Sequence, residues 1–230
     1  MTPVIVLQAR MGSSRLPGKA IARIGGRTIL QRCLDRLRAA SGMPVVLATT
    51  TRPEDDVLAL EAQARGVPVC RGADADVLSR FLLTARTLRA THVVRATADN
   101  PAVDLDAPAR VMQHLVRSGA DYVAEPDLPC GAGVEALSVR ALAEAAELAI
   151  GPGDREHVTP VLRRAGRFHA VLAPAPAALR RPDLRLTVDT SDDLAFMRRV
   201  MGCFESWTVE PPLAAIIGVA HAMRLPARSA

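Results

Sequence analysis

The stretch that decides the fold is VIVLQARMGSSRLPGK, residues 4–19. Its apolar start, residues 4–7, is typical of a buried strand, and a loop rich in glycine and serine follows. Three cations, Arg10, Arg15 and Lys19, are spaced along that loop. In an open α/β sheet, ligands bind at the carboxyl ends of the strands, where such a loop offers backbone N–H groups and positive charge to phosphates. The stretch therefore predicts a site for a triphosphate.

Strand-like runs alternate with amphipathic helical runs through the first half of the chain. Such alternation implies a mostly parallel sheet with right-handed crossovers and helices on both faces, which is an α/β fold. The predicted strands are 4–9, 45–49, 67–70, 92–95 and 121–124, and the predicted helices are 28–39, 54–65, 76–88 and 106–118.

The alternation becomes irregular after residue 124. The predicted elements there are strands at 134–137, 168–172 and 184–188, and helices at 139–148, 155–165, 192–204 and 212–223. No internal repeat occurs, and no linker is long enough to separate two independent domains. The prediction is one domain over residues 1–230, with a small inserted β/α flap at 125–180.

The composition is that of a globular protein, with 230 residues, 49% hydrophobic and 23% charged. The net charge of +5 attracts anions, but 3% aromatic residues and the lack of long charge blocks disfavour nucleic-acid binding. The four cysteines are far apart and form no CxxC pair, which indicates reduced thiols rather than zinc ligands. Residues 213–223, the longest nearly apolar stretch, are too few to span a membrane. We expect a cytoplasmic protein without a membrane partner.

Two aspartates follow predicted strands on the same rim as the cationic loop. Asp99 comes after the strand at 92–95, and Asp189 follows the strand at 184–188. A lone aspartate in such a place is commonly a turn former or a helix cap, and three cations alone also fit a basic surface turn. Two carboxylates opposite a phosphate loop, however, suit Mg²⁺, which takes one or two carboxylates together with substrate phosphates and water. The sequence therefore predicts a Mg²⁺ site at Asp99 and Asp189.

These motifs together resemble the cytidylyltransferase family, and most of all its SpsF-like branch of spore-coat polysaccharide proteins, which is related to the CMP-sugar-acid synthetases. The resemblance runs from residue 4 to about residue 196 and is carried by an ordered set of strings. These are QARMGSSRLPGK (8–19), ATTT (48–51) with Asp55-Asp56, RG (71–72), DVLSRF (76–81), TADNP (97–101), GVE (133–135), REHVTP (155–160) and TVD (187–189).

The resemblance implies a Rossmann-like, GT-A-like nucleotidyltransferase fold. It also implies an enzyme that transfers CMP from CTP to a sugar acid or related surface-glycan precursor, with Mg²⁺ as cofactor and pyrophosphate as product. Relatives of this kind are commonly homodimers. The acceptor expected from the chemistry is a small anionic molecule: a sugar acid, a sugar phosphate or a phosphonate.

The resemblance also assigns roles to residues of this chain. Catalytic roles fall to Arg15, Lys19, Asp99 and Asp189, of which Asp99 and Asp189 hold the metal. Nucleotide binding falls to Ala9, Arg10, Met11, Gly12, Ser13, Ser14, Arg15, Lys19, Thr49, Thr50, Gly72, Asp76 and Asp99. The acceptor or the dimer partner faces Glu135, Arg155, Glu156 and His157. Two roles stay open for His157: it is either a general base or orienting group, or a helix cap. Two roles also stay open for Glu135, a contact to the sugar and a structural ion pair.

Two segments depart from the family pattern. Relatives tend to read Gly-Asp-Cys-Pro-Leu where this chain has residues 98–102, ADNPA, and they often carry aspartate where it has Gly133. The phosphate and metal residues are kept, whereas an acceptor-side carboxylate is missing. Three alternatives therefore stay open: CMP transfer to a phosphonate or other small phosphorylated acceptor, a glycosyltransferase on the same fold, and a nucleotide-binding regulator without catalysis.

Overall fold

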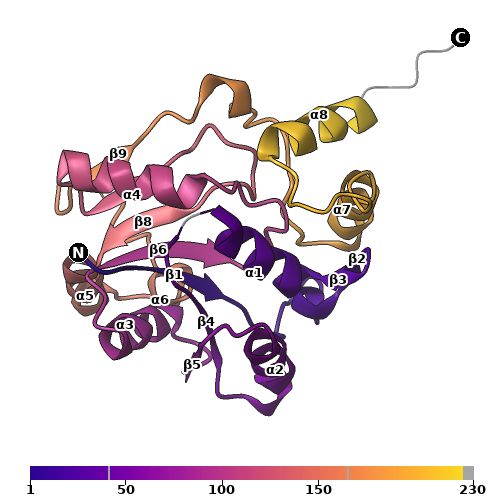
Figure 1. Cartoon of the computed structure of the whole chain (residues 1–230). Helices are drawn as coiled ribbons and strands as arrows, with labels where there is room; N and C mark the ends of the chain where they lie inside the picture. The colour runs from indigo at the N-terminus through magenta and orange to yellow at the C-terminus, as the bar shows by residue number, and fades with distance from the viewer. Residues whose placement is uncertain (41, 165, 225–230) are drawn as a thin grey trace, which may run out of the picture.

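A seven-stranded sheet forms the centre of the computed structural model, which describes residues 1–40, 42–164 and 166–224 (Figure 1). The strand order is β5-β4-β1-β6-β8-β7-β9. The strands are β1 (Pro3–Gln8), β4 (Val45–Thr50), β5 (Val69–Gly72), β6 (His92–Thr97), β7 (Tyr122–Ala124), β8 (Glu135–Ser138) and β9 (Ala170–Leu172).

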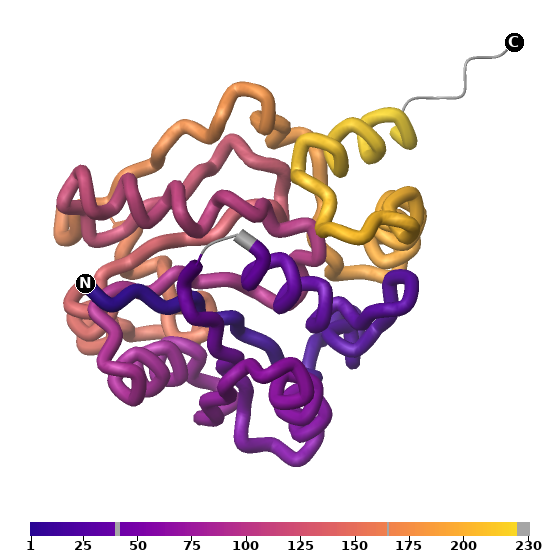
Figure 2. Tube along the Cα trace, viewed as in Figure 1, coloured from indigo at the N-terminus to yellow at the C-terminus, as the bar shows by residue number. Residues whose placement is uncertain are grey.

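The sheet is mostly parallel, as the βαβ alternation predicted. β1 pairs in parallel with β4 and β6, β4 with β5, and β7 with β9. Within this sheet, as far as the described residues show, only β8 runs antiparallel to both of its neighbours, β6 and β7. The chain leaves β1 toward β5 and returns to β6 on the other side, so the order of the strands reverses beside β1 (Figure 2). A reversal of this kind creates the crevice in which α/β proteins bind ligands.

Helices cover both faces of the sheet because its central strands are apolar on both sides. In β1, Val4 and Val6 face one core, and Ile5 and Leu7 face the other, as the two-residue period of a strand requires. The core that contains Ile5 is completed by α1 (Ile29–Ala40), α2 (Asp56–Ala64), α4 (Ala107–Ser118), α7 (Ser191–Gly202) and α8 (Leu213–Arg224). The core that contains Val4 is completed by α3 (Val77–Thr87) and α5 (Val139–Leu148), and α6 (Pro152–His157) packs against α3.

Some local elements were not predicted. A two-stranded hairpin, β2 (Arg23–Ile24) with β3 (Arg27–Thr28), follows the cationic loop and turns at two glycines. The described residues also include short 3₁₀ helices, η1 (Lys19–Ile21), η2 (Pro53–Asp55) and η3 (Ala177–Leu179). The strand predicted at 67–70 lies two residues later, as β5.

The predicted helix at 155–165 is wrong. The helix present, α6, begins at Pro152 and ends at His157. Val158 has φ of 69° and ψ of −52°, which no helical residue adopts, and turns follow it. The sequence shows no glycine or proline at position 158 to mark this end, so the helix was predicted to continue beyond it.

The predicted strand at 184–188 is also wrong as a regular strand. A single isolated bridge joins Cys130 to Arg185, and the Leu186 N–H donates to the Cys130 carbonyl at 2.8 Å. The segment nevertheless runs along the end of β6, because the Val188 N–H donates to the Asp99 carbonyl at 2.8 Å. Asp189 therefore reaches the rim where the strand prediction had placed it.

The segment 125–180, predicted as an inserted flap for the acceptor and the dimer partner, supplies two strands to the main sheet. β8 lies between β6 and β7, and β9 pairs with β7 at the sheet edge. The division of residues 1–230 into one domain with this subregion stays a prediction, as does the contact of the subregion with an acceptor or a second copy.

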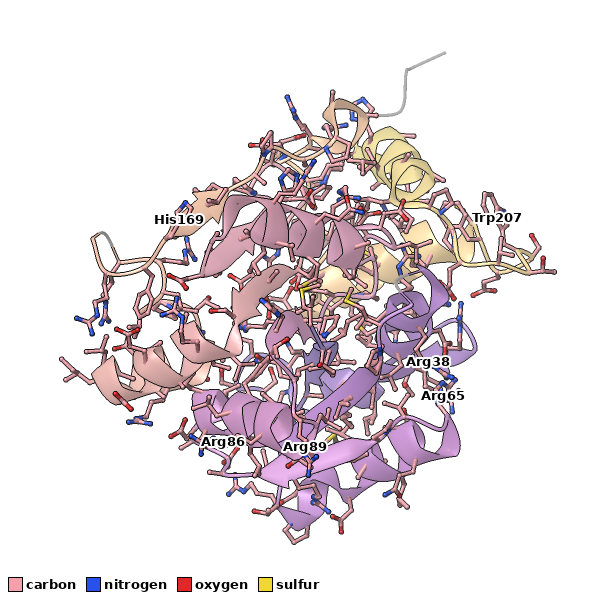
Figure 3. The ribbon with its side chains drawn as sticks, turned by 60° about the vertical axis from the view of Figure 1, so that its left-hand side comes forward. Arg38, Arg65, Arg86, Arg89, His169 and Trp207 are labelled. Carbon is pink, nitrogen blue, oxygen red and sulfur yellow. The ribbon has the colours of Figure 1, made fainter. Side chains whose placement is uncertain are left out.

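A buried arginine joins α1 to the loop after β6 and to the segment that precedes α8. Arg36, in α1, is fully buried and donates to the carbonyls of Val103 at 2.7 Å and Pro211 at 2.9 Å. In the loop between α7 and α8, Trp207 lies at the surface (Figure 3). Its ring packs edge-on against that of Phe204, with the centroids 5.1 Å apart. None of the helices in the described parts of the chain has the length and apolar character that a membrane span requires.

Gly131 is required where the loop after β7 crosses the segment that carries Asp189. It has φ of 90°, and a Cβ there would lie 2.6 Å from the Thr187 nitrogen. We expect Gly131→Ala to lower the free energy of unfolding by about 2 kcal/mol, because it adds both a backbone clash and strain. Urea denaturation measures this loss.

Gly133→Ala is the matched control for that variant. Gly133 lacks a positive φ, and the atom nearest to a Cβ placed there would be the Leu128 Cδ1 atom, at 3.6 Å. The stability of this variant should stay within about 0.5 kcal/mol of the parent. Equal losses at the two glycines would contradict the close approach at Gly131.

Candidate active site

The cationic loop and the two aspartates meet at the carboxyl ends of the central strands. Gln8 of β1 lies opposite Thr97 of β6 in the parallel register, and the Ala98 N–H donates to the Gln8 carbonyl at 2.9 Å. The loop after β1 and the loop after β6 are therefore neighbours. The Val188–Asp99 backbone bond adds the third segment, so three parts of the chain distant in sequence share one rim.

The cationic loop folds back on itself before it enters η1. The Met11 carbonyl accepts the N–H groups of Ser13 at 2.9 Å and Gly18 at 3.1 Å. Gly18 adopts the left-handed conformation, with φ of 70°, and Lys19 begins the 3₁₀ helix directly after it. The loop thus presents its side chains from a short closed turn, in contrast to a P-loop, which leads into an α-helix.

Asp55 fastens this loop to β4. One carboxylate oxygen, Oδ1, accepts the Met11 N–H at 2.7 Å, and the other, Oδ2, accepts the Thr50 N–H at 3.3 Å and the Thr50 hydroxyl. The side chain is buried, with 2% exposure. Sequence reasoning noted Asp55 only as part of a family string, because nothing local shows that its partner lies 44 residues away.

Lys19 lies between the two aspartates. Its Nζ donates to Asp99 Oδ2 at 2.9 Å, to Asp189 Oδ1 at 2.9 Å and to the Val188 carbonyl at 3.1 Å. These three bonds use the three donors of an ammonium group. The predicted catalytic residues therefore form one cluster at the rim.

Asp189 is the most heavily paired carboxylate of this cluster. Besides Lys19, Arg15 forms an ion pair with it, with Nη2 2.9 Å from Oδ1, and Arg185 Nη2 donates to Oδ2 at 2.5 Å. Partial burial opposes ionisation of Asp189, but the hydrogen bonds from Lys19 and Arg185 and the charges of Lys19 and Arg15 outweigh it and hold its pKa below the ordinary value. Asp189 is thus a carboxylate anion at neutral pH.

Arg10 connects the loop to α6 across the cavity. Its Nη2 lies 2.6 Å from Glu156 Oε1, and its Nη1 lies 3.6 Å from Asp74 Oδ1. The neighbouring residue Arg155 points elsewhere: it pairs with Asp76 at 2.8 Å, and Asp76 also caps α3 by accepting the Ser79 N–H at 2.8 Å. Although they are adjacent in sequence, Glu156 therefore pairs with the cationic loop and Arg155 with the cap of α3.

A cavity of about 260 Å³ opens between the loop, α3, α6 and the rim. Most of the predicted site residues line it: Ala9, Arg10, Gly12, Ser13, Ser14, Arg15, Lys19, Asp99, Glu156, His157 and Asp189. Sequence reasoning missed Gln8, Ala20, Val77, Arg80, Arg95, Thr97 and Ala98, which line it as well.

The other predicted residues lie outside the cavity wall. Thr49 and Thr50 are fully buried in β4, and the Met11 N–H is taken by Asp55. Gly72 lies at the end of β5, Asp76 caps α3, and Arg155 lies beside that cap. Glu135 is the other predicted residue outside the wall.

Arg80 and Arg95 are cavity residues to which sequence reasoning assigned no role, although Arg80 lies in the family string DVLSRF. Arg80, in α3, is 2% exposed, and its Nη1 donates to the carbonyls of Ala73 and of Asp74, the latter at 2.9 Å. Burial lowers the pKa of Arg80, and the charge of Arg10 acts in the same direction. The Nε atoms of Arg80 and Arg95 are buried and have no hydrogen-bond partner among the described residues.

Glu135 lies behind Arg95, and the cavity wall as described does not include it. Its carboxylate accepts Arg95 Nη1 at 2.6 Å, the Tyr122 hydroxyl at 2.5 Å and the Thr159 hydroxyl at 3.1 Å. Burial, and then the charge of Glu135, raise the pKa of Tyr122, so its hydroxyl stays protonated as a donor. Glu135 thus orients one arginine of the cavity.

The end of α6 is strained where His157 enters the cavity. The Thr159 N–H donates to the His157 carbonyl at 2.7 Å across Val158, whose φ is 69°. This is a γ-turn with positive φ, which is rare and costs energy for a β-branched residue. The strain is maintained by the burial of Val158, which is 0% exposed, and by the Thr159–Glu135 bond.

The arrangement suits a polyanion together with a divalent cation. Five cationic side chains and three carboxylates line the cavity, and the carboxylates Asp99 and Asp189 lie together on one side. Nowhere in residues 1–40, 42–164 and 166–224 do three His, Cys, Asp or Glu side chains gather into a metal cluster. Two carboxylates fit Mg²⁺ when phosphate oxygens and water complete its shell.

Comparisons with known proteins agree with this chemistry. A family model described as cytidylyltransferase matches residues 4–207. The chain is similar to the spore coat polysaccharide biosynthesis protein SpsF of Bacillus subtilis, at 31% identity, with 83% of this chain and 82% of the relative covered. A solved cytidylyltransferase structure from Leptospira borgpetersenii has a TM-score of 0.90 and 28% identity, covering 97% of this chain and 95% of that one. CMP:2-keto-3-deoxy-manno-octonic acid synthetase, solved in complex with CTP, shares the fold, with a TM-score of 0.65, 20% identity and coverage of 88% and 99%.

Proposed function

The chain belongs to the cytidylyltransferase family, and from this premise we propose that it transfers CMP from CTP to a small sugar acid and releases pyrophosphate. The observation that carries the proposal is the cluster at the rim, where Lys19 contacts both Asp99 and Asp189 beside the cationic loop. Such a transfer depends mainly on positioning and on neutralising phosphate charge, and this cluster can do both.

The phosphates of CTP lie over the loop of residues 10–19 in this proposal. Arg15 and Lys19 take the charge of the β- and γ-phosphates, and the serines at 13 and 14 add hydroxyl donors. The base and ribose lie toward the ends of β4 and β5, near Gly72 and Asp76, with Thr49 and Thr50 as the strand beneath them. Arg80, which lines that side of the cavity, supports this orientation.

The carboxylates of Asp99 and Asp189 would hold a magnesium ion. The donor set fits, because hard oxygen ligands are what Mg²⁺ prefers and two carboxylates leave room for phosphates. Bound there, the ion would supply positive charge to the phosphate oxygens and withdraw electrons from phosphorus. The manganese in a structure that shares this fold is consistent with a divalent cation.

In the reaction, an acceptor oxygen forms a bond to the α-phosphorus while the bond from that phosphorus to the bridging oxygen of pyrophosphate breaks. Lys19 and Arg15 stabilise the charge that develops on the departing pyrophosphate. The proton of the acceptor hydroxyl passes to a base, for which we propose His157, at the acceptor side of the cavity.

The acceptor half of the cavity favours an anion. Arg95, Glu156 and His157 line this half, and Arg95 is held in place by Glu135. We propose that a carboxylate of the acceptor pairs with Arg95, as a sugar acid allows. Glu135 and Arg155, predicted as acceptor contacts, would then support the site through their ion pairs with Arg95 and Asp76.

A phosphonate or other small phosphorylated alcohol is the second candidate acceptor. Gly133 favours it, since relatives often carry a carboxylate at that position and a phosphorylated acceptor would be repelled by one. The CTP half of the site would be unchanged.

The homodimer and the cytoplasmic location stay predictions. The homodimer is supported by the exposure of Leu148, Ile150 and Leu172 within residues 125–180.

A pyrophosphate-release screen tests the proposal. The purified chain with Mg²⁺ is given CTP, UTP, ATP or GTP, each against 2-keto-3-deoxy-manno-octonic acid, other sugar acids, sugar phosphates and phosphonates. We expect release with CTP and a sugar acid, and CMP attached to the acceptor by mass spectrometry. Release only with phosphonates supports the second candidate, and no release with any combination refutes both.

A further inference from the structure

The cations of the phosphate loop already have anionic partners within the protein. Lys19 contacts Asp99 and Asp189, Arg15 contacts Asp189, and Arg10 contacts Glu156. Each pair joins the loop to another segment of the chain. A phosphate that binds the loop must therefore compete with these carboxylates, and a metal ion that binds the carboxylates must compete with these cations.

The competition is strongest at Lys19. Its ammonium lies 2.9 Å from Asp99 Oδ2 and 2.9 Å from Asp189 Oδ1, so it occupies the position between the two carboxylates. The three side chains are mostly buried, with 14%, 27% and 15% exposure, so solvent screens the pairs only partly. A divalent cation would need these same two carboxylates.

We propose that the ammonium of Lys19 acts as a resident cation of the Asp99–Asp189 pair, so that metal ion and nucleotide bind cooperatively by exchanging partners. A metal ion alone must displace the ammonium and leave without a partner the two donors that pair with these carboxylates. CTP alone must draw Lys19 away, which takes from Asp99 the cation it pairs with and leaves Asp189 with Arg15 and Arg185, both carboxylates lying next to the phosphates of CTP. When both bind, the metal takes the carboxylates and Lys19 takes the phosphates, so every charge is paired.

This inference rests on the proposed function for the identity of the nucleotide. It adds an expectation that the function alone does not give, namely that removal of a cation from the site strengthens metal binding. The coupling is reciprocal, since the metal must raise the affinity for CTP by the factor by which CTP raises the affinity for the metal.

Manganese binding to the full-length chain tests the inference, with Mn²⁺ as a paramagnetic substitute for Mg²⁺. Free Mn²⁺ is measured by electron paramagnetic resonance with and without CTP, in the parent protein and in Lys19→Met. We expect Lys19→Met to bind Mn²⁺ alone about tenfold more tightly, and the factor by which CTP tightens Mn²⁺ binding to fall by about tenfold.

Arg185→Met is the matched control. It also removes a cation from Asp189, but from Oδ2, on a side chain that the described cavity wall does not include. We expect it to change Mn²⁺ affinity by the same factor with and without CTP, so that the coupling is unchanged. Lys19→Gln, of different shape, repeats the test if Lys19→Met does not fold.

Two outcomes overturn the inference. One is a Lys19 variant that folds and binds Mn²⁺ alone no more tightly than the parent, and the other is an equal loss of coupling in Arg185→Met. The failure of the proposed function is distinguishable, because the parent protein would then show no binding of Mn²⁺ with CTP and no pyrophosphate release.

Discussion

Asp99→Asn will lower the rate of pyrophosphate release from CTP by about 10³-fold, a loss of about 4 kcal/mol of transition-state stabilisation. Asparagine keeps the size of the side chain but removes the charge that would hold the metal ion and that now pairs with Lys19 at 2.9 Å. The rate is measured with saturating Mg²⁺, CTP and the acceptor found in the screen. Circular dichroism shows whether the fold is retained.

Asp183→Asn is the control for this charge change. Asp183 is 61% exposed and pairs with Arg181, outside the cavity wall. Its rate should stay within about twofold of the parent, because exposed ion pairs contribute little. If the Asp99→Asn variant keeps more than about a tenth of the parent rate, the assignment of Asp99 as a metal ligand is wrong.

Asp55→Ala will lower the free energy of unfolding by about 3 kcal/mol, because it leaves buried donors of Met11 and Thr50 without an acceptor. The same change frees the phosphate loop from β4, so we also expect CTP to bind about tenfold more weakly. Urea denaturation gives the first quantity, and calorimetric titration with CTP gives the second.

Glu54→Ala removes a carboxylate from the same turn and serves as the control. Glu54 is exposed, so its loss should change stability by no more than about 0.5 kcal/mol and leave CTP affinity unchanged. If Asp55→Ala matches this control in CTP affinity, the bond to Met11 does not position the loop.

The parts of the fold that follow from local patterns could be predicted from the sequence. β1 is apolar on both sides, so its burial and the loop at its carboxyl end follow from residues 4–19 alone. Asp99 and Asp189 were expected on one rim, and the structure joins them through Lys19. The rule that strand ends gather at one edge was sufficient, even though residues 184–188 form no regular strand.

The parts that depend on distant contacts could not be predicted. α6 ends at Val158 because burial and the Thr159–Glu135 bond outweigh the strain of a positive φ, and a helical period contains no such information. Arg80 is buried by packing, whereas an arginine in an amphipathic helix is ordinarily exposed. The antiparallel direction of β8 is likewise set by its neighbours and not by its four residues.

The pairing of Lys19 has a practical consequence, because Lys19 is the single lysine of the 230-residue chain. Acylating reagents that modify primary amines have one side-chain target in the protein, besides the terminal amine. A mass increase assigned to a lysine, once it has been distinguished from one at the terminal amine, is therefore an increase at the rim. Lys19 is thus a single side-chain site for labelling amines, at the rim where it pairs with Asp99 and Asp189.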